Sequence, residues 1–401
     1  MALSLDVERL RADTPGAGER IHLNNAGAAL MPAPVLRRVR EHLELEAHIG
    51  GYEAAEEVSD EVESARADVG RLVGAEPRNI AFTEHATASF VQALSSIPFR
   101  AGDVLVTSRA DYVSNQIQYL SLAERLGIEV LRLPDGPDGT LDLHALEAAL
   151  QRRRPRAVAL SHVPTYAGLV QPAAAVGALC RRHGVLYLLD ACQSVGQMPL
   201  EVADLGCDFL AATARKFLRG PRGAGFLYVS DRVLDEGLTP LFVDLQGADW
   251  VADDVFQPLP DARRFETWEF AYALLLGMGE AARYALDLGL DAIARRTRAL
   301  SDRLRAGLNG LDAVTVLDEG EDRAAIVPIT VRGWRPDALM LALRARGVNT
   351  STLTRASAVL EFDARGVEGA LRLSPHYYNT EAEIDEVLRL LDAFLAFASD
   401  V

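Results

Sequence analysis

One lysine stands out among the residues that could do chemistry. The chain of 401 residues contains 41 lysine and arginine residues, and Lys216 is the only lysine among them. Arginine can replace lysine where only a solvated positive charge is needed, but its guanidinium stays protonated and cannot act as a nucleophile. A lysine kept in an arginine-rich chain therefore indicates a Schiff-base role for its amine. The alternative is a chance survivor of drift toward arginine.

An acidic residue is placed to work with this lysine. Lys216 follows the predicted strand CDFLAAT (207–213), and Asp190 ends the preceding predicted strand VLYLLD (185–190). In an open parallel sheet, ligands bind beyond the carboxyl ends of the strands. A carboxylate at the end of an apolar strand is costly unless a cation meets it, and the ring nitrogen of pyridoxal phosphate is such a cation. The pair predicts a pyridoxal phosphate site, with a helix N-cap as the alternative role for Asp190.

The phosphate of this cofactor would need a helix N-terminus. The segment FTEHATASFVQAL (82–94) offers one, with Thr87 and Ser89 as hydroxyl donors and the backbone amides of Ala86 and Thr87 at the predicted helix start. His85 either contacts the phosphate or faces solvent.

Strands and helices alternate through the part of the chain that carries these residues. Apolar segments predict strands at 79–83, 103–108, 129–134, 157–163, 185–190, 207–213 and 224–230. Amphipathic segments predict helices at 34–47, 53–73, 86–97, 114–127 and 172–184. Continuous apolar strands separated by such helices indicate an α/β fold with a mostly parallel sheet covered on both faces.

The pattern changes after about residue 270. A long helical stretch at 277–311 leads to predicted strands at 314–319 and 324–331 and a helix at 336–347. Thr380, with Glu383 three residues later, predicts a capping box at the start of the last helix. We expect a large α/β domain of residues 21–269 and a smaller α+β domain of residues 1–20 and 270–401, with a ligand cleft between them.

Composition narrows the function classes. The net charge of −16 argues against a nucleic-acid partner. The first 20 residues lack the apolar core of a signal peptide, and no apolar run is long enough to span a bilayer, so we expect a cytoplasmic protein without membrane contact. Cys180, Cys192 and Cys207 have no metal-site spacing and are too few for a disulfide framework, which predicts reduced thiols and no metal.

The segment VLYLLDACQSVGQMPLEVADLGCDFLAATARKFLRGPRGAGFLYV (185–229) resembles class V of the pyridoxal-phosphate-dependent aminotransferase superfamily. The final motif LRLSPHYYNTEAEID is similarly specific, and weaker similarity in IHLNNAGAALMP, FTEHATASF, SHVPTYAGLV and RRFETWEF extends the resemblance over nearly the whole chain. The class includes cysteine desulfurases, selenocysteine lyases, isopenicillin N epimerase and hercynylcysteine sulfoxide lyases. The resemblance implies fold type I, an amino-acid substrate, and a homodimer with shared active sites.

The resemblance also implies how the cofactor is held. Lys216 would carry it as a Schiff base and then move protons, Asp190 would pair with the ring nitrogen, and Gln193 would bond to the ring hydroxyl. The implied phosphate ligands are Ala86, Thr87 and Thr213.

Substrate contacts follow from the same resemblance. Arg372 would grip the substrate carboxylate, a task that suits a bidentate guanidinium, and a surface salt bridge is the alternative. Asn25 and Ala26 would lie in the substrate entry loop, with Thr165 among the substrate-binding residues. Arg264 would approach the cofactor of the partner subunit.

Departures from the class bear on the reaction. Desulfurases carry a mobile cysteine shortly before the final arginine motif, and the matching segment GVNTSTLTRASAVLEFDARG (347–366) has none. Tyr112 replaces the histidine that stacks on the cofactor ring, and a tyrosine can both stack and act as an acid; a core aromatic is the alternative. Arg215 replaces the histidine before the lysine, and either binds phosphate or faces solvent. Thr267 is the nearest candidate for a cross-subunit phosphate ligand.

Several of these departures are shared with the hercynylcysteine sulfoxide lyases, as in IGGYEAA, RKFLRGPRG and LRLSPH. We therefore expect a C–S lyase that eliminates the β-substituent of an S-substituted cysteine or a cysteine sulfoxide, giving pyruvate and ammonia. Epimerisation and transamination use the same machinery and stay open, and a persulfide-forming desulfurase is less favoured. The non-enzyme alternatives are a transcription regulator, for which no helix-turn-helix segment precedes residue 20, and a scaffold.

Overall fold

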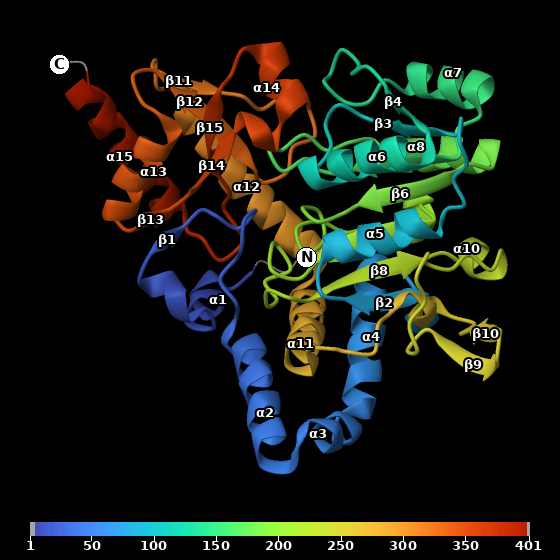
Figure 1. The fold of residues 1–401 in the computed structure, drawn as a ribbon. Coiled ribbons are helices and arrows are strands. Elements are labelled where there is room, and N and C mark those ends of the chain that lie inside the picture. The colour runs from blue at the N-terminus through green and yellow to red at the C-terminus, as the bar shows by residue number, and fades with distance from the viewer. Residues whose placement is uncertain (1–4, 399–401) are drawn as a thin grey trace.

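The computed structural model describes residues 5–398, so residues 1–4 and 399–401 of the predicted smaller domain lie outside the described part (Figure 1). Its centre is a seven-stranded sheet in the order β2-β8-β7-β6-β5-β3-β4. The strands are β2 (Ile80–Thr83), β3 (Val104–Thr107), β4 (Glu129–Arg132), β5 (Ala157–Ser161), β6 (Leu186–Asp190), β7 (Phe209–Thr213) and β8 (Gly225–Val229). The α/β class and the mostly parallel mixed sheet are confirmed.

Strand direction decides where the functional residues meet. β8 runs antiparallel to β2 and β7, and the other neighbouring strands are parallel. The strands β2, β3, β5, β6 and β7 therefore present their carboxyl ends at one edge of the sheet. The segments that follow these strands contain most of the residues predicted for the site.

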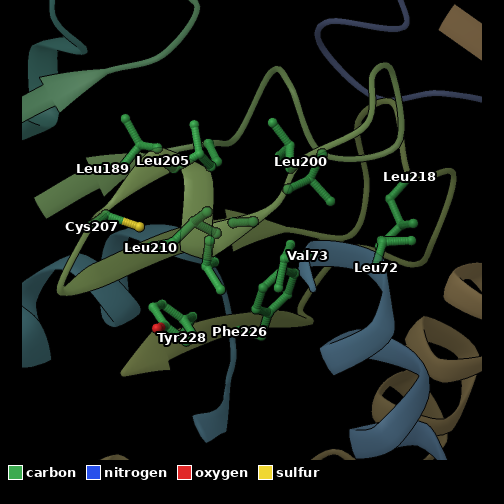
Figure 2. Close-up of a cluster of buried hydrophobic side chains, with 14 of the residues drawn as sticks. Leu72, Val73, Leu189, Leu200, Leu205, Cys207, Leu210, Leu218, Phe226 and Tyr228 are labelled. Atoms are coloured by element: carbon green, nitrogen blue, oxygen red, sulfur yellow. The ribbon is translucent and has the colours of Figure 1, made fainter. Parts of the chain in front are cut away.

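Apolar side chains alternate between the two faces of this sheet. On β6, Leu188 packs with one cluster of buried side chains and Leu189 with the other. Figure 2 shows part of the second cluster, where Phe226 lies near Val73 of α4 (Ser59–Val73) and Leu189 lies with Leu205 and Cys207. Because both faces bury apolar surface, the strands read as continuous apolar runs.

Helices cover both faces. One face is covered by α5 (Ala86–Ser96) and α6 (Val113–Leu126). The other packs against α4, α7 (Leu143–Arg153), α8 (Ala173–His183) and α11 (Tyr272–Leu288). The helices α2 (Ala33–Ile49) and α3 (Gly51–Glu57) extend from the body of the molecule (Figure 1). Shorter helices are α1 (Val7–Ala12), η1 (Pro15–Gly18), η2 (Pro77–Asn79), α9 (Val202–Leu205), α10 (Asp231–Asp235) and η3 (Ala262–Phe265).

A second, smaller sheet follows in the chain. It is antiparallel in the order β11-β12-β15-β14, formed by β11 (Val314–Val316), β12 (Val327–Val331), β14 (Ser351–Thr354) and β15 (Gly369–Leu373). The helices α12 (Leu290–Asn309), α13 (Pro336–Ala345) and α15 (Glu381–Ala398) share its core. The segment between β14 and β15 forms η4 (Arg355–Ser357) and α14 (Val359–Arg365).

Several details differ from the sequence-based expectations. The helical stretch at 277–311 is two helices, because Gly289 adopts a φ of 83° between α11 and α12, a conformation that favours glycine. A hairpin of β9 (Ala248–Ala252) and β10 (Val255–Pro258) was not predicted. Two segments cross the predicted boundaries: β1 (Ile21–His22) pairs with β13 (Val348–Asn349), and α11 packs into the core of the large sheet. The two-domain division itself stays a prediction.

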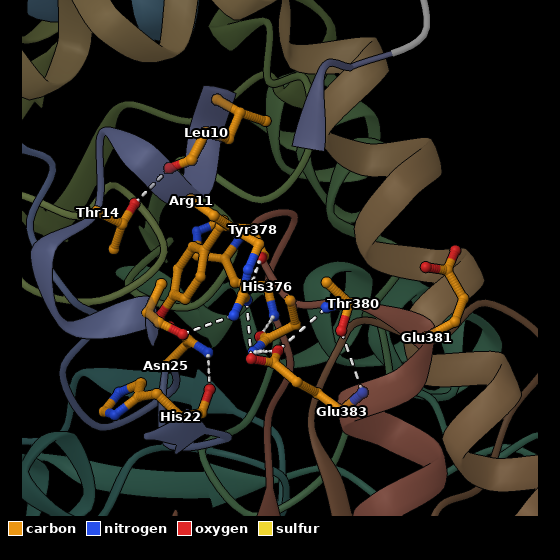
Figure 3. Close-up of polar contacts among 12 residues, drawn as sticks. Leu10, Arg11, Thr14, His22, Asn25, His376, Tyr378, Thr380, Glu381 and Glu383 are labelled. Atoms are coloured by element: carbon orange, nitrogen blue, oxygen red, sulfur yellow. Dashed lines mark hydrogen bonds and ion pairs between the residues drawn. The ribbon is translucent and has the colours of Figure 1, made fainter. Parts of the chain in front are cut away.

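The predicted capping box at the last helix is confirmed. The backbone N–H of Glu383 donates to the Thr380 hydroxyl at 3.1 Å, and the Thr380 N–H donates to the Glu383 carboxylate at 3.1 Å (Figure 3). Within residues 5–398, no helix is long and apolar enough to cross a membrane.

Candidate active site

A pocket of about 340 Å³ opens at the carboxyl edge of the large sheet. Many residues singled out in the sequence line it, from segments far apart in the chain. These are Ala86, Thr87, Tyr112, Thr165, Asp190, Gln193, Thr213, Arg215 and Lys216. The topology thus gathers the predicted cofactor residues into one cavity.

Lys216 lies in a tight loop after β7. The loop is closed by backbone hydrogen bonds, from the Gly220 N–H to the Ala214 carbonyl at 2.8 Å and from the Arg219 N–H to the Lys216 carbonyl at 2.9 Å. The lysine side chain is buried, and no described residue forms a hydrogen bond or ion pair with its Nζ. Burial lowers the pKa of Lys216, although Cys192 and Asp190 act in the opposite direction. A depressed pKa favours the neutral amine that a nucleophile requires.

Asp190 ends β6 inside the same pocket and is buried. Its Oδ1 accepts from the Cys192 N–H at 3.0 Å, and its Oδ2 accepts from the Asn115 amide at 3.0 Å. No described Lys, Arg or His side chain forms an ion pair with Asp190. The carboxylate is therefore held in place by neutral donors and keeps room for a cationic partner.

Gln193 has one end of its amide occupied and the other free. Its Nε2 donates to the Ala26 carbonyl and to the Thr165 hydroxyl, each at 3.3 Å. Its buried Oε1 has no partner. A buried amide oxygen without a donor is costly, so this atom is suited to accept a hydrogen bond from a ligand hydroxyl. Ala26 takes part through its backbone carbonyl.

The start of α5 forms one wall of the pocket. His85 caps the helix, because its Nδ1 accepts from the Ala88 N–H at 3.0 Å. The amides of Ala86 and Thr87 have no acceptor among the described residues, and a helix N-terminus of this kind suits an anion. Ser89 was predicted as a phosphate donor, and this prediction is wrong. Its hydroxyl is buried beneath the helix and donates to the Phe226 carbonyl at 3.0 Å.

Arg372 is a buried guanidinium without an acidic partner. Its Nη1 donates to both the carbonyl and the hydroxyl of Thr165, each at 2.9 Å, and its Nε has no partner. Burial lowers the pKa of Arg372 to about 10, with Arg215 acting in the same direction. The surface salt bridge considered for Arg372 is excluded, since the residue is buried and no described carboxylate pairs with it. A buried, uncompensated cation beside a pocket is suited to a carboxylate ligand.

Arg215 supplies a second positive charge at the pocket wall. Its Nη1 donates to the Gly27 carbonyl, which ties the lysine loop to the segment after β1. It lines the pocket rather than facing bulk solvent, and burial lowers its pKa.

Asn25 has a different role from the one expected. Its Nδ2 donates to the carbonyls of His22 at 3.1 Å and Ser374 at 2.7 Å, and its Oδ1 accepts from the Tyr378 hydroxyl at 2.6 Å (Figure 3). The side chain is fully buried and does not line the pocket. The expected contact of the Asn25 side chain with substrate therefore needs correction, because its donors and acceptor are already used within the protein.

Arg264 and Thr267 also lie away from the pocket. The Arg264 guanidinium donates to the carbonyls of Leu259, Leu234 and Leu238, so it joins two segments of the chain. The expected approach of Arg264 to the cofactor of a partner subunit stays a prediction. Thr267 is partly exposed beside Trp268, itself about half exposed.

Cys180 and Cys207 are buried thiols, whereas Cys192 is partly buried and lines the pocket. Burial raises the pKa of Cys180 to about 12 and raises those of Cys192 and Cys207 further. All three are free, and among residues 5–398 no group of acidic, histidine or cysteine side chains could hold a metal ion.

The free groups around the pocket match the parts of pyridoxal phosphate. An unpaired amine, a carboxylate without a cation, an amide oxygen without a donor, and a helix N-terminus with free amides all face one cavity. They correspond to the aldehyde, ring nitrogen, ring hydroxyl and phosphate of the cofactor. The residues present therefore fit the group.

Sequence reasoning missed Arg222, which lines the pocket, and Asn115, which contacts a pocket residue from behind. Arg222 lines the cavity from the loop after Lys216; its position in RGPRG could have marked it as a further cation. Asn115 contacts Asp190 from the first turn of α6. Nothing in the helical pattern around Asn115 distinguishes it from a solvent-facing polar residue.

Comparisons with known proteins agree with this geometry. The family described as aminotransferase class-V matches residues 21–387. A probable cysteine desulfurase 2 of Mycobacterium leprae is 30% identical over 97% of this chain and 98% of its own length. The apo structure of a cysteine desulfurase from Thermococcus onnurineus NA1 is 25% identical with a TM-score of 0.90, covering 99% of this chain and 100% of that one.

A third comparison bears on the fold. A mutant of C-DES, with glycine covalently linked to its PLP cofactor, shares the fold at a TM-score of 0.84 and 24% identity, covering 95% of this chain and 99% of that one. The buried lysine, its acidic neighbour and the family match lead to one conclusion. The chain belongs to the class-V aminotransferase family and is a pyridoxal-phosphate-dependent enzyme.

Proposed function

We propose that the enzyme is a C–S lyase that cleaves the β-substituent from an S-substituted cysteine or a cysteine sulfoxide. The cysteine desulfurases among its relatives support a cysteine-type substrate. In the reaction, the Cβ–S bond breaks, sulfur leaves as a thiol or sulfenic acid, and water releases ammonia and pyruvate from the remaining three-carbon unit. No external oxidant or reductant is needed.

The observation that carries this choice is the location of the cysteines. A desulfurase passes sulfur to a cysteine thiolate of its own. The segment from β13 to α14, where desulfurases have that residue, contains no cysteine here. Cys180 and Cys207 are buried and do not line the pocket, and Cys192 lines it. All three thiols have raised pKa values, so they are poor thiolates at neutral pH. This favours release of the sulfur product to solution.

The cofactor contacts are part of the proposal. Lys216 holds the cofactor covalently, Asp190 pairs with the ring nitrogen, and Gln193 accepts from the ring hydroxyl. The proposed phosphate-binding residues are Ala86, Thr87, Thr213, Arg215 and Arg222. When bound, pyridoxal phosphate supplies the electron sink that stabilises negative charge at the substrate α-carbon.

The protein groups divide the remaining work. The Arg372 guanidinium binds the substrate carboxylate and is itself held by Thr165. The Lys216 amine takes the α-proton, which its lowered pKa favours. The Tyr112 hydroxyl donates a proton to the departing sulfur.

We also propose a homodimer, supported by an apolar surface. The loop before the β9–β10 hairpin and the hairpin itself expose large apolar side chains, namely Leu241, Phe242, Leu245, Trp250, Val251, Val255 and Phe256. Exposed apolar area of this kind marks an interaction surface, and a second copy of the chain is its proposed occupant. Thr267 lies beside the exposed Trp268 and stays our candidate for a phosphate ligand across the dimer. Sedimentation of the native protein tests this; a monomer at micromolar concentration would refute it.

Product analysis tests the reaction. The purified holoenzyme is incubated separately with L-cysteine, S-alkyl-L-cysteines and their sulfoxides, and pyruvate, ammonia and alanine are measured. Pyruvate and ammonia in equal amounts, without alanine, are the expected result. Alanine with a protein-bound persulfide would replace the proposal with a desulfurase. A keto acid that retains sulfur would indicate transamination, and racemised substrate would indicate epimerisation.

A further inference from the structure

A second buried carboxylate lies behind the cofactor pocket. Asp111 precedes α6, is almost fully buried, and forms no ion pair with any described cation. Four hydroxyl or backbone groups donate to it, from Ser161 at 2.6 Å, the Tyr112 N–H at 2.7 Å, Tyr119 at 2.8 Å and Thr107 at 3.0 Å. So many donors fix the position of both carboxylate oxygens.

Asn115 connects this carboxylate to the one in the pocket. Its Nδ2 donates to Asp111 Oδ1 at 3.1 Å and to Asp190 Oδ2 at 3.0 Å. An amide nitrogen has two hydrogens, so both are used. An ionised carboxylate only accepts hydrogen bonds, and a carboxylate therefore lies on each side of the same NH₂ group. The amide has one acceptable orientation, with nitrogen toward both aspartates.

The arrangement has a direct consequence for Asp190. Without the NH₂ group, two buried carboxylates would face each other without a donor between them. Burial raises the pKa of Asp111, and the negative charge of Asp190 adds to the effect. Asn115 offsets this repulsion and leaves the ionised form of Asp190 in a defined position. The same Asp111 accepts from the Tyr112 N–H and so also fixes the start of the helix that follows the stacking ring.

We propose that Asn115, oriented by Asp111, is a positioning residue that holds the Asp190 carboxylate toward the ring nitrogen of pyridoxal phosphate. This inference rests on the proposed pairing of Asp190 with that nitrogen, but not on the reaction that the enzyme catalyses. Loss of the Asn115 amide should therefore weaken cofactor binding through Asp190 and leave the rest of the fold unchanged.

A double-mutant cycle on cofactor affinity tests the inference. The full-length apoprotein is titrated with pyridoxal phosphate, and the dissociation constant is measured for wild type, Asn115→Leu, Asp190→Asn and the double variant. We expect Asn115→Leu to weaken binding about tenfold, since a hydrogen bond to a charged group is lost. In the Asp190→Asn background, the same change should cost less than about twofold, because the two residues act as one unit.

A matched control separates this effect from general destabilisation. Asn79 is also buried and donates to the Val229 carbonyl at 2.8 Å and to Asp231 at 3.0 Å, but it does not line the pocket. Asn79→Leu should leave the dissociation constant unchanged within about twofold, which is the resolution of such a comparison. If Asn115→Leu does not fold, Asn115→Ser carries the same prediction with a smaller side chain.

A spectroscopic readout accompanies the affinities. The visible band of the lysine-bound cofactor is titrated with pH, and its midpoint should shift in Asn115→Leu but not in Asn79→Leu. Equal losses of affinity for Asn115→Leu in both backgrounds would overturn the proposal while leaving the role of Asp190 intact. If Asp190→Asn bound pyridoxal phosphate with wild-type affinity, the pairing of Asp190 with the ring nitrogen would be refuted, and the role proposed for Asn115 with it. Neither outcome depends on whether the enzyme is a lyase.

Discussion

The Nζ of Lys216 lies 5.9 Å from the centroid of the Tyr112 ring. The two side chains come from the loop after β7 and from the residue before α6, and both line the same pocket. This relationship places an amine and a phenol in one cavity, the two groups that the proposed elimination would use as base and acid.

Tyr112→Phe separates the two proposed roles of the tyrosine. Phenylalanine keeps the ring and removes the hydroxyl, so we expect cofactor affinity to be unchanged while kcat for elimination falls about a hundredfold or more, as for loss of a general acid. Steady-state kinetics with an S-substituted cysteine whose thiol is a poor leaving group check the result. An unchanged kcat would assign the proton to another donor, and Tyr112→Ala, which also removes the ring, should additionally weaken cofactor binding.

Lys216→Arg tests the singular lysine with a change that keeps the charge. We expect the visible band of the lysine-bound cofactor to disappear and turnover to fall by at least about a hundredfold, because the guanidinium cannot act as nucleophile or base. Absorption spectra and thermal unfolding are measured together. A retained band in a folded variant would show that Lys216 is not the attachment point.

Arg372→Met removes the proposed carboxylate clamp. A hydrogen bond between charged groups contributes about 1.5–3 kcal/mol, so the KM for amino-acid substrates should rise between about tenfold and a hundredfold. The dissociation constant of the cofactor should stay within about twofold of wild type. Arg303→Met is the control, since Arg303 forms an exposed ion pair with Asp385 and should leave both values unchanged. Equal loss of cofactor and substrate affinity in Arg372→Met would argue against the clamp.

Replacing Cys180, Cys192 and Cys207 together with alanine tests the release of sulfur to solution. We expect kcat and the yield of pyruvate to stay within about threefold of wild type, because thiols with raised pKa values are poor nucleophiles and take no part in the proposed reaction. The melting temperature is measured in parallel to exclude unfolding. Loss of sulfur release in a folded triple variant would revive the desulfurase interpretation.

The stability of the fold should depend on pH through His162. Burial lowers the pKa of this imidazole from 6.5 to about 4. Between pH 6.5 and about pH 4, the His162 imidazole is therefore protonated in the unfolded state but neutral in the folded state. Stability is full above pH 6.5 and is lost as the pH falls toward 4, by about 3 kcal/mol for this group alone.

His162→Gln is the variant that isolates this contribution. The free energy of unfolding in urea is compared at pH 7.5 and pH 5 for both proteins. The drop should be smaller in the variant by about 2 kcal/mol. An identical drop would mean that His162 is not buried as a neutral group.

Local sequence was sufficient for much of the sheet and for the core of the cofactor site. Asp190 ends one apolar strand and Lys216 follows the next, and neighbouring parallel strands bring their carboxyl ends to one edge, so the proximity of the two residues could be predicted without coordinates. The helix start of α5 at the same edge was also predictable from local sequence, because α5 directly follows a strand of this sheet. The capping box of Thr380 and Glu383 needs only three residues of spacing, and the structure confirms it.

The tertiary structure decided the contacts that join distant segments. The hydrogen bonds of Arg372 with Thr165 span 207 positions, that of Asn115 with Asp190 spans 75, and that of Asn25 with Ser374 spans 349. No pattern within one helix or loop shows whether a polar side chain turns toward a cavity or toward a backbone carbonyl. The expected substrate role of Asn25 is therefore replaced by a structural one, whereas Asn115, which the sequence does not single out, contacts Asp190. Residue type fixes the chemistry that a side chain can perform, but packing of remote segments fixes which partner it meets.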